Sequence, residues 1–238
     1  MIKGIVFTEG GGPSPSPPER AFAGVADGQQ ILQNAFSQLF QQVIPDLQVP
    51  FIFDMRGGWQ DTLYDFGRAL AEEQEILICL LIDYADVPGE NYLTKKEYLN
   101  KTLSEKEGLP VLPSDFSEYF GNIFFMVQKM EAWILSQPKV IDQCFGHLRP
   151  LEKLAQFNAQ KTRRLLNPAS AIPNPDTALN ELLGYCVKVD RKGISRRLKY
   201  EKGGKVKLAY EMLTKLDLFT LMAKFEDVRA LVEKLKSV

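Results

Sequence analysis

The sequence predicts an α/β protein with a parallel sheet of four or more strands, flanked by helices and followed by a mostly helical C-terminal part. Three apolar runs of strand length support this prediction, and each leads to an acidic residue, at Glu9, Asp83 or Glu131. Amphipathic stretches with helical spacing lie between the strand-like runs, as in β-α-β units. Continuous apolar runs are typical of strands that are buried on both faces of a parallel sheet.

The first half of the chain alternates between the two kinds of pattern. Expected strands comprise Gly4–Glu9, Val49–Phe53, Ile76–Ile82 and a run that starts at Ile123. Expected helices comprise residues 27–44, Trp59–Glu73, Thr94–Lys106 and Glu131–Gln137. Apolar residues recur at spacings of three and four within the first two of these helices. Thr94 and Glu97 have the spacing of a capping box, which predicts that the third helix begins there.

Beyond Pro150 the strand-like apolar runs give way to segments with helical patterns. Further helices are expected at Leu151–Leu166, Ala178–Tyr185, Val206–Leu216 and Phe219–Lys236. The chain therefore divides into an α/β core at 1–150 and a basic helical extension at 151–238, which is either separate or integral to the same domain. A chain of 238 residues is long enough for one large α/β core with a smaller appendage.

Charge is unevenly distributed along the chain. Residues 1–150 contain 11 Lys and Arg against 20 Asp and Glu, whereas residues 151–238 contain 18 against 10. A basic half is typical of proteins that bind a polyanion such as nucleic acid, because clustered Lys and Arg attract phosphate and release counterions. The other interpretation is that the basic half docks on the acidic half of the same molecule.

Cysteine usage and hydropathy indicate a cytoplasmic protein. Cys79, Cys144 and Cys186 are odd in number and lack CxxC spacing, so neither a disulfide framework nor a zinc site is expected. The N-terminus enters a strand without the pattern of a secretory leader. The longest purely apolar run, Ile76–Ile82, is too short to span a bilayer. We therefore expect neither secretion nor a membrane segment.

The acidic residues at the strand ends are the main candidates for a functional site. In a parallel sheet the carboxyl ends of neighbouring strands face one crevice, so Glu9, Asp83, Asp86 and Glu131 can converge there. Such oxygen ligands suit Mg²⁺ or Mn²⁺, and a metal at this place supports cleavage of a phosphodiester. The alternative is that each carboxylate merely ends a strand or begins a helix.

The order of strands and acidic residues resembles a TOPRIM domain, the fold of topoisomerases, primases and related nucleases. More narrowly, three segments resemble an uncharacterised bacterial family related to TOPRIM, designated domain of unknown function 4276 and often encoded beside ATPases in defence loci. The segments are Thr8-Glu9-Gly10, Leu81-Ile82-Asp83-Tyr84-Ala85-Asp86, and Gln128 to Leu135 with its Glu-Ala-Trp motif.

The resemblance implies a Mg²⁺-dependent phosphodiesterase or nuclease that acts on nucleic acid with an ATPase partner in bacterial defence. It implies that Glu9 acts as general acid or base, while Asp83 holds the metal together with Asp86 or Glu131. TOPRIM domains usually carry Asp-x-Asp, and the second Asp is replaced here by Ala85. A catalytically degraded binding module for nucleic acid or a partner protein is therefore the alternative, and an enzyme acting on a small nucleotide is a third hypothesis.

The segment from Lys188 to Lys207 is the candidate nucleic-acid contact. It holds nine basic residues against two acidic ones, with Tyr200 and glycines between them. This pattern is typical of a phosphate-binding surface, although a solvated loop accounts for it equally well. The residues expected to contact nucleic acid are Lys188, Arg191, Lys192, Arg196, Arg197 and Lys199.

Overall fold

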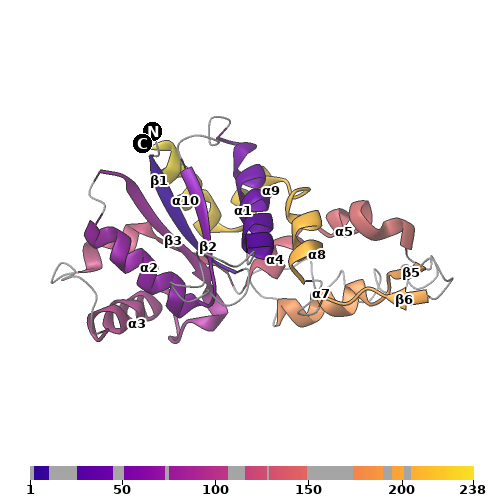
Figure 1. Cartoon of the computed structure of the whole chain (residues 1–238), viewed down its shortest axis with the longest axis horizontal. Helices are drawn as coiled ribbons and strands as arrows, with labels where there is room; N and C mark the ends of the chain where they lie inside the picture. Colours follow the sequence, from indigo (N-terminus) through magenta and orange to yellow (C-terminus); the bar gives the residue numbers. More distant parts are fainter. Residues whose placement is uncertain are drawn as a thin grey trace.

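Four parallel strands form the main sheet of the computed structural model, in the spatial order β2-β1-β3-β4 (Figure 1). They are β1 (Gly4–Glu9), β2 (Phe51–Arg56), β3 (Leu77–Asp83) and β4 (Ile123–Met126). The structure describes residues 3–10, 26–44, 51–72, 75–106, 116–127, 129–148, 174–189, 195–200 and 205–238. The predicted α/β class with a parallel sheet of at least four strands is confirmed.

Helices cover both faces of this sheet. The helices are α1 (Ala26–Gln41), α2 (Trp59–Glu72), α3 (Tyr92–Ser104), α4 (Met130–Leu135), α5 (Pro138–Phe145), α7 (Pro175–Leu183), α8 (Lys205–Leu213), α9 (Leu218–Lys224) and α10 (Glu226–Lys236). Short 3-10 turns are η2 (Tyr84–Asp86), η3 (Phe116–Asn122) and η4 (Gly146–Leu148). None of the helices in the described part of the chain combines the length and apolar character needed to span a lipid bilayer.

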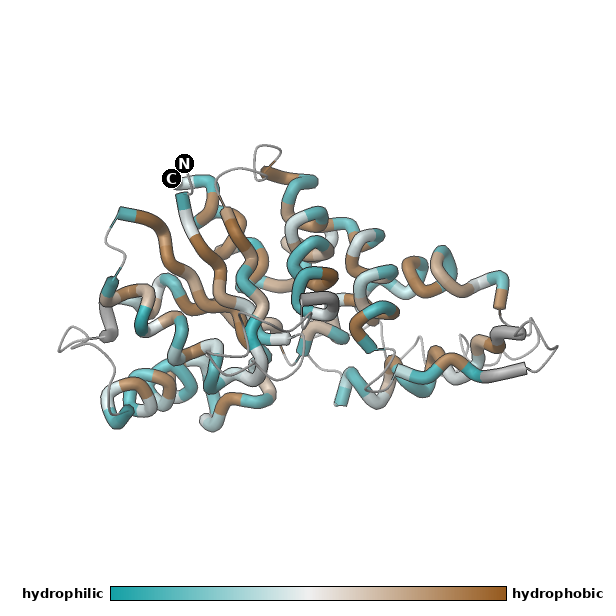
Figure 2. The backbone as a smooth tube through the Cα atoms, viewed as in Figure 1, coloured by the Kyte–Doolittle hydropathy of each residue, from teal (hydrophilic) through white to brown (hydrophobic). Residues whose placement is uncertain are grey.

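Side chains of the central strands alternate between two hydrophobic clusters. Val6 and Leu81 belong to the cluster that includes α1, α4, α8 and α10, whereas Phe7 and Leu80 belong to the cluster that includes α2 and α3. This alternation follows from the two-residue period of a strand. Figure 2 shows the resulting concentration of hydrophobic residues along the strands. Burial on both faces explains why the sequence of β3 is apolar throughout.

The C-terminal helices share the core of the sheet. Helix α8 packs against α1 (Figure 1), and α10 packs against β4. Asp227 at the start of α10 accepts hydrogen bonds from the Phe125 N–H of β4 at 3.0 Å and from the Tyr92 hydroxyl at 2.7 Å. One hydrophobic cluster therefore includes residues from both sides of position 150.

Helix α3 begins two residues earlier than expected from the sequence. Its N-cap is Asn91, whose side chain accepts the Thr94 N–H at 3.0 Å, and Thr94 Oγ1 in turn accepts the Asn91 N–H. Thr94 is thus the N3 residue of the capping box rather than its N-cap, and the predicted pairing with Glu97 is wrong. Asn is as effective an N-cap as Ser or Thr, so Asn91 can cap the helix in place of Thr94.

The predicted single helix Phe219–Lys236 is two helices. The chain is extended at Phe225, with φ −123° and ψ 113°, and the buried ring of this residue lies 6.4 Å from Trp133. Glu226 and Asp227 then begin α10, where acidic residues interact favourably with a helix N-terminus. Because Phe225 is buried like the apolar residues of the flanking helices, the helical periodicity of the sequence does not reveal this break.

The basic segment contains a pair of short antiparallel strands, β5 (Val187–Val189) and β6 (Ser195–Arg197). Arg197 and Lys199 are exposed. Arg191 and Lys192 lie outside the described residues, as does the predicted helix at Leu151–Leu166. The prediction that this segment contacts nucleic acid remains a prediction.

Candidate functional site

Three carboxylates converge at the carboxyl end of the sheet. Glu9 is the last residue of β1, Asp83 is the last residue of β3, and Asp86 ends the η2 turn that follows. Because β1 and β3 pair directly in parallel, their ends are adjacent. One carboxylate oxygen from each of the three residues lies within 4.8 Å of the others. The predicted convergence of acids at this edge is therefore present for Glu9, Asp83 and Asp86.

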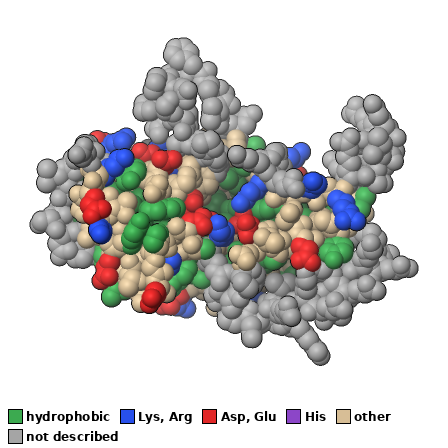
Figure 3. Space-filling model, turned by 90° about the horizontal axis from the view of Figure 1, so that it is seen from below, with side chains coloured by type: hydrophobic (Ala, Val, Ile, Leu, Met, Phe, Trp, Pro, Cys, Tyr) green, Lys and Arg blue, Asp and Glu red, His purple; other side chains and the backbone are tan. Residues whose placement is uncertain are grey.

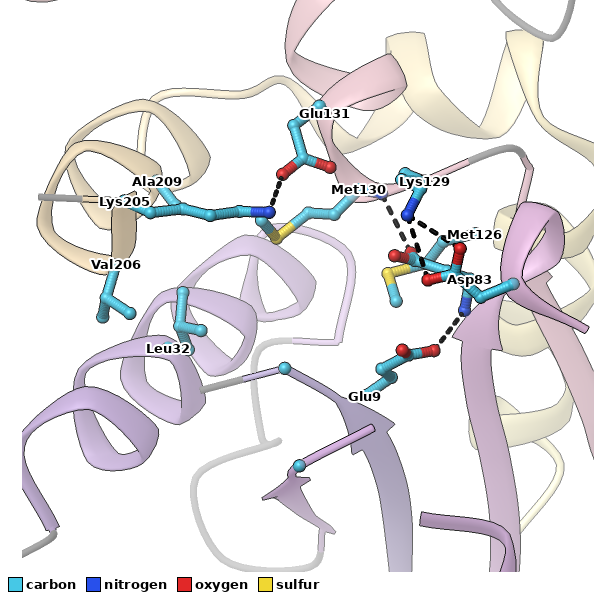
Figure 4. A pocket seen from close by; sticks show the side chains of 13 residues that line it. Glu9, Leu32, Asp83, Met126, Lys129, Met130, Glu131, Lys205, Val206 and Ala209 are labelled. Carbon is cyan, nitrogen blue, oxygen red and sulfur yellow. Dashed lines mark hydrogen bonds and ion pairs between the residues drawn. The ribbon is translucent and has the colours of Figure 1, made fainter. Parts of the chain in front are cut away.

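Backbone hydrogen bonds hold two of these carboxylates in place. Glu9 Oε2 accepts the Asp83 N–H at 3.0 Å, which ties the end of β1 to the end of β3. Asp83 Oδ1 accepts the N–H of Met130, the first residue of α4, at 3.1 Å. Figure 4 shows Glu9 and Asp83 facing the same space from neighbouring strands. The carboxylates are thus positioned by the sheet and by the start of α4.

Lys129 supplies a positive charge beside the cluster. Its Nζ lies 2.8 Å and 3.0 Å from the two carboxylate oxygens of Asp86. Burial lowers the pKa of Lys129, but the hydrogen bond and charge of Asp86 outweigh burial and raise it overall. The lysine therefore remains charged at neutral pH and offsets part of the negative charge of the three acids.

Burial, together with the charge of neighbouring acids, raises the pKa values of the two acids at the strand ends. Burial, and then the charge of Asp86, raises the pKa of Glu9 to about 7, although hydrogen bonds from the Asp83 and Trp59 amides oppose the shift. Burial followed by the charges of Glu9, Glu131 and Asp86 raises the pKa of Asp83 well above its ordinary value. Clustered acids with raised pKa values are typical of functional sites.

A cavity of about 470 Å³ opens beside the acidic cluster (Figure 4). Its polar lining includes the three acids with Lys129 at one end, and Glu131 with Lys205 at the other. Its apolar lining consists of Leu32, Met126, Met130, Val206 and Ala209. Seen from the carboxyl edge of the sheet, acidic and basic side chains lie together near the middle of the molecule, beside hydrophobic side chains (Figure 3).

Glu131 lines the cavity but is not part of the three-carboxylate cluster. It lies in the first turn of α4, and its Oε1 is 2.7 Å from Lys205 Nζ. The Glu131 side chain is only 2% exposed, whereas that of Lys205 is 45% exposed. The structure thus groups Asp86 and Glu9 with Asp83, and gives Glu131 a lysine partner from the basic segment. A metal ligand role for Glu131 remains a prediction.

The sequence alone does not single out two features of this cavity. Lys129 lies two residues before Glu131 of the Glu-Ala-Trp motif, and this position is the signal that could have identified it. The apolar wall built by Leu32 of α1 and Val206 of α8 joins helices far apart in the chain, so no local pattern predicts it.

The donor set of the cluster fits a hard divalent cation. All of the donors are carboxylate oxygens, the ligands that Mg²⁺ and Mn²⁺ prefer. Two unit charges of the same sign 4 Å apart repel by about 4 kcal/mol at the effective dielectric of a protein surface. A bound cation would relieve this repulsion, which Lys129 relieves only in part. Glu9, Asp83 and Asp86 are the residues that would hold it.

We expect the metal-free protein to lose stability as the pH rises from 4.5 to about 7, the ordinary and folded-state pKa values of Glu9. In this range folded Glu9 keeps a proton that the unfolded chain has released, so raising the pH favours unfolding. Glu9→Gln removes this titration and should make the decline less steep. Thermal unfolding in a chelator at closely spaced pH values measures both slopes, and equal slopes would contradict the assignment.

Comparison with known proteins identifies the family but not the activity. The model of the family described as Domain of unknown function (DUF4276) matches residues 28–236. This range covers most of the chain and contains Asp83, Asp86, Lys129 and Glu131, whereas Glu9 precedes it. No curated protein and no solved structure matches the chain. Because the family model matches well over half of the chain, from the first turn of α1 to the end of α10, the chain belongs to the DUF4276 family.

Proposed function

We propose that this protein is a metal-dependent phosphodiesterase of TOPRIM type that cleaves nucleic acid. The observation that carries the proposal is the convergence of Glu9, Asp83 and Asp86 oxygens within 4.8 Å at the carboxyl end of adjacent parallel strands. The resemblance of the strand-end motifs to TOPRIM domains extends the proposal to a cytoplasmic role in bacterial defence, together with an ATPase partner.

Each residue of the cluster has a task in this proposal. Asp83 and Asp86 hold Mg²⁺ or Mn²⁺, which when bound would stabilise the negative charge that develops on the phosphoryl oxygens. Glu9, whose pKa is about 7, is suited to take or give a proton near neutral pH. Lys129 holds Asp86 through both of its oxygens and thereby fixes one wall of the site.

The experiment that tests the proposal combines metal binding with cleavage. Purified protein is titrated with Mn²⁺ by calorimetry, and then incubated with labelled single- and double-stranded DNA and RNA in Mg²⁺, Mn²⁺ or a chelator. We expect binding of Mn²⁺ and cleavage that the chelator abolishes. Protein that neither binds Mn²⁺ nor changes its melting temperature in millimolar Mg²⁺ would overturn the proposal.

Two observations favour a second candidate, a binding module without catalysis. Lys129 already neutralises Asp86 within the molecule, and Ala85 stands where TOPRIM domains usually have a second Asp. Because Lys129 already offsets part of the negative charge, the cluster has less need of a bound metal to relieve repulsion between its acids. In that case the protein should retain nucleic acid on a filter at low salt without cleaving it, and Glu substitutions in the basic segment should weaken retention because phosphate contacts are lost.

A further inference from the structure

The cavity has two chemically different parts. One end carries the acidic cluster and Lys129, and the other carries the Glu131–Lys205 ion pair. Aliphatic and methionine side chains from β4, α1, α4 and α8 line the rest of the cavity, and Figure 4 shows Leu32 and Val206 on the side of Lys205. A hydrated ion or an inorganic phosphate would contact only the end that carries the acidic cluster and Lys129. The apolar wall therefore indicates a ligand that extends beyond its phosphate.

The apolar wall is built by packing between distant helices. Leu32 of α1 is 3% exposed and Ala209 of α8 is 1% exposed, so both are held in the core. Val206, one turn before Ala209, is half-buried, and Figure 4 shows it beside Leu32 at the edge of the cavity. Packed side chains of this kind form a preformed surface that can cover a flat ring without rearranging.

The far end of the cavity offers hydrogen-bonding groups. Lys205 Nζ can donate and the Glu131 carboxylate can accept, and the two groups lie 2.7 Å apart. A base edge presents both donors and acceptors, so it can replace contacts that solvent makes with such a pair. An aliphatic chain would cover the pair without replacing those contacts, at a cost in desolvation. The polar pair thus favours a heterocyclic ring over a lipid tail.

The size of the cavity limits how much nucleic acid can enter. Its volume of about 470 Å³ lies within the range of roughly 300–1,000 Å³ that is usual for small-ligand sites. A stacked duplex keeps its bases inside the helix, so a base reaches a cavity of this kind from a free nucleotide, a strand end or a flipped position.

We propose that the cavity binds one nucleotide unit, with its phosphate at the acidic cluster and its base against the wall formed by Leu32, Val206 and Ala209. This inference rests on the proposed metal-dependent function and adds the substrate class. Glu131 and Lys205 contact the base edge and set the preference among bases, which gives Glu131 a role distinct from holding the metal.

The test compares adenosine 5′-monophosphate with ribose 5-phosphate, titrated by calorimetry into the intact protein in Mn²⁺. The nucleotide should bind at least about tenfold more tightly, because the base buries apolar surface that the sugar phosphate lacks. Val206→Trp, which fills the apolar part, should remove this difference while Mn²⁺ affinity is unchanged. Lys215→Trp, at an exposed position just beyond α8 and outside the basic segment, is the matched control and should behave as wild type.

The outcomes separate the inference from the proposed function. If the protein binds Mn²⁺ but has equal affinities for adenosine 5′-monophosphate and ribose 5-phosphate, the inference is overturned while the proposed function stands. This comparison uses only the wild-type protein. Absence of Mn²⁺ binding would overturn both proposals. If a 5′-phosphorylated single-stranded oligonucleotide binds more tightly than the mononucleotide, the ligand of the cavity is a strand end. If the mononucleotide binds more tightly, the ligand is a free nucleotide. Preferential binding of closed circular duplex DNA over both would contradict the inference.

Discussion

Asp83→Asn is expected to abolish divalent-metal binding and to lower metal-dependent activity by about a hundredfold or more, since a bound metal stabilises the transition state by several kcal/mol. The same substitution should leave the metal-free protein as stable as wild type, or more stable. Asn can still accept the Met130 N–H that Asp83 Oδ1 accepts. It also removes a carboxyl whose pKa is raised by burial and by the charges of Glu9, Glu131 and Asp86.

Calorimetric titration with Mn²⁺ and thermal unfolding in a chelator measure the two effects. Asp142→Asn, at an exposed position of α5, is the matched control and should change neither. Because folded Asp83 holds its proton to higher pH than the unfolded chain, the stability gain of Asp83→Asn should grow as the pH rises. A variant that is less stable than wild type in the chelator and still binds Mn²⁺ would show that Asp83 is a structural strand end.

Metal binding to wild-type protein should also release protons. The pKa of Glu9 is raised to about 7 in the metal-free state, and a cation bound beside it at Asp83 and Asp86 would favour its charged form, so a proton is released. Titrations in buffers of different ionisation enthalpy report this release, which makes the perturbed pKa values observable without any substitution.

Much of the fold was predictable because its signals are local. The apolar run of β3 and the helical spacing of α2 each specify an element, and the parallel arrangement places Glu9 and Asp83 at one edge. The sequence alone therefore predicts that these two acids are neighbours. The break at Phe225 could not be predicted, since it depends on a ring that is buried against Trp133 from another part of the chain.

The cavity itself was beyond sequence reasoning, because it depends on tertiary contacts. The basic segment was predicted as a surface for phosphate, yet Lys205 at its end lies beside buried Glu131. Asp86 was predicted to assist a metal, and the structure shows in addition that Lys129 binds it. Charge patterns identify which residues are available, whereas their pairing is decided by tertiary contacts such as the one between Lys205 of α8 and Glu131 of α4.

The Glu-Ala-Trp motif shows how one short segment serves two purposes. Glu131 lines the cavity, while Trp133, two residues further along α4, is fully buried. The Trp133 ring lies 6.0 Å from Phe36 of α1 and 6.4 Å from Phe225. The tryptophan therefore joins α4 to α1 and to the break between α9 and α10, and it holds Glu131 against the cavity only indirectly.

We expect Trp133→Ala to destabilise the protein by about 3–5 kcal/mol, because it leaves a large cavity in the main hydrophobic cluster. This loss is a large fraction of the roughly 5–15 kcal/mol by which domains are usually stable. Urea unfolding followed by circular dichroism measures it. Trp59→Ala is the matched control, since Trp59, the other of two tryptophans, is only half-buried and should cost less. Trp133→Phe keeps most of the packing and should bind Mn²⁺ as wild type does. If this folded variant lost Mn²⁺ binding, Trp133 would have to act in the site itself rather than in the core that supports it.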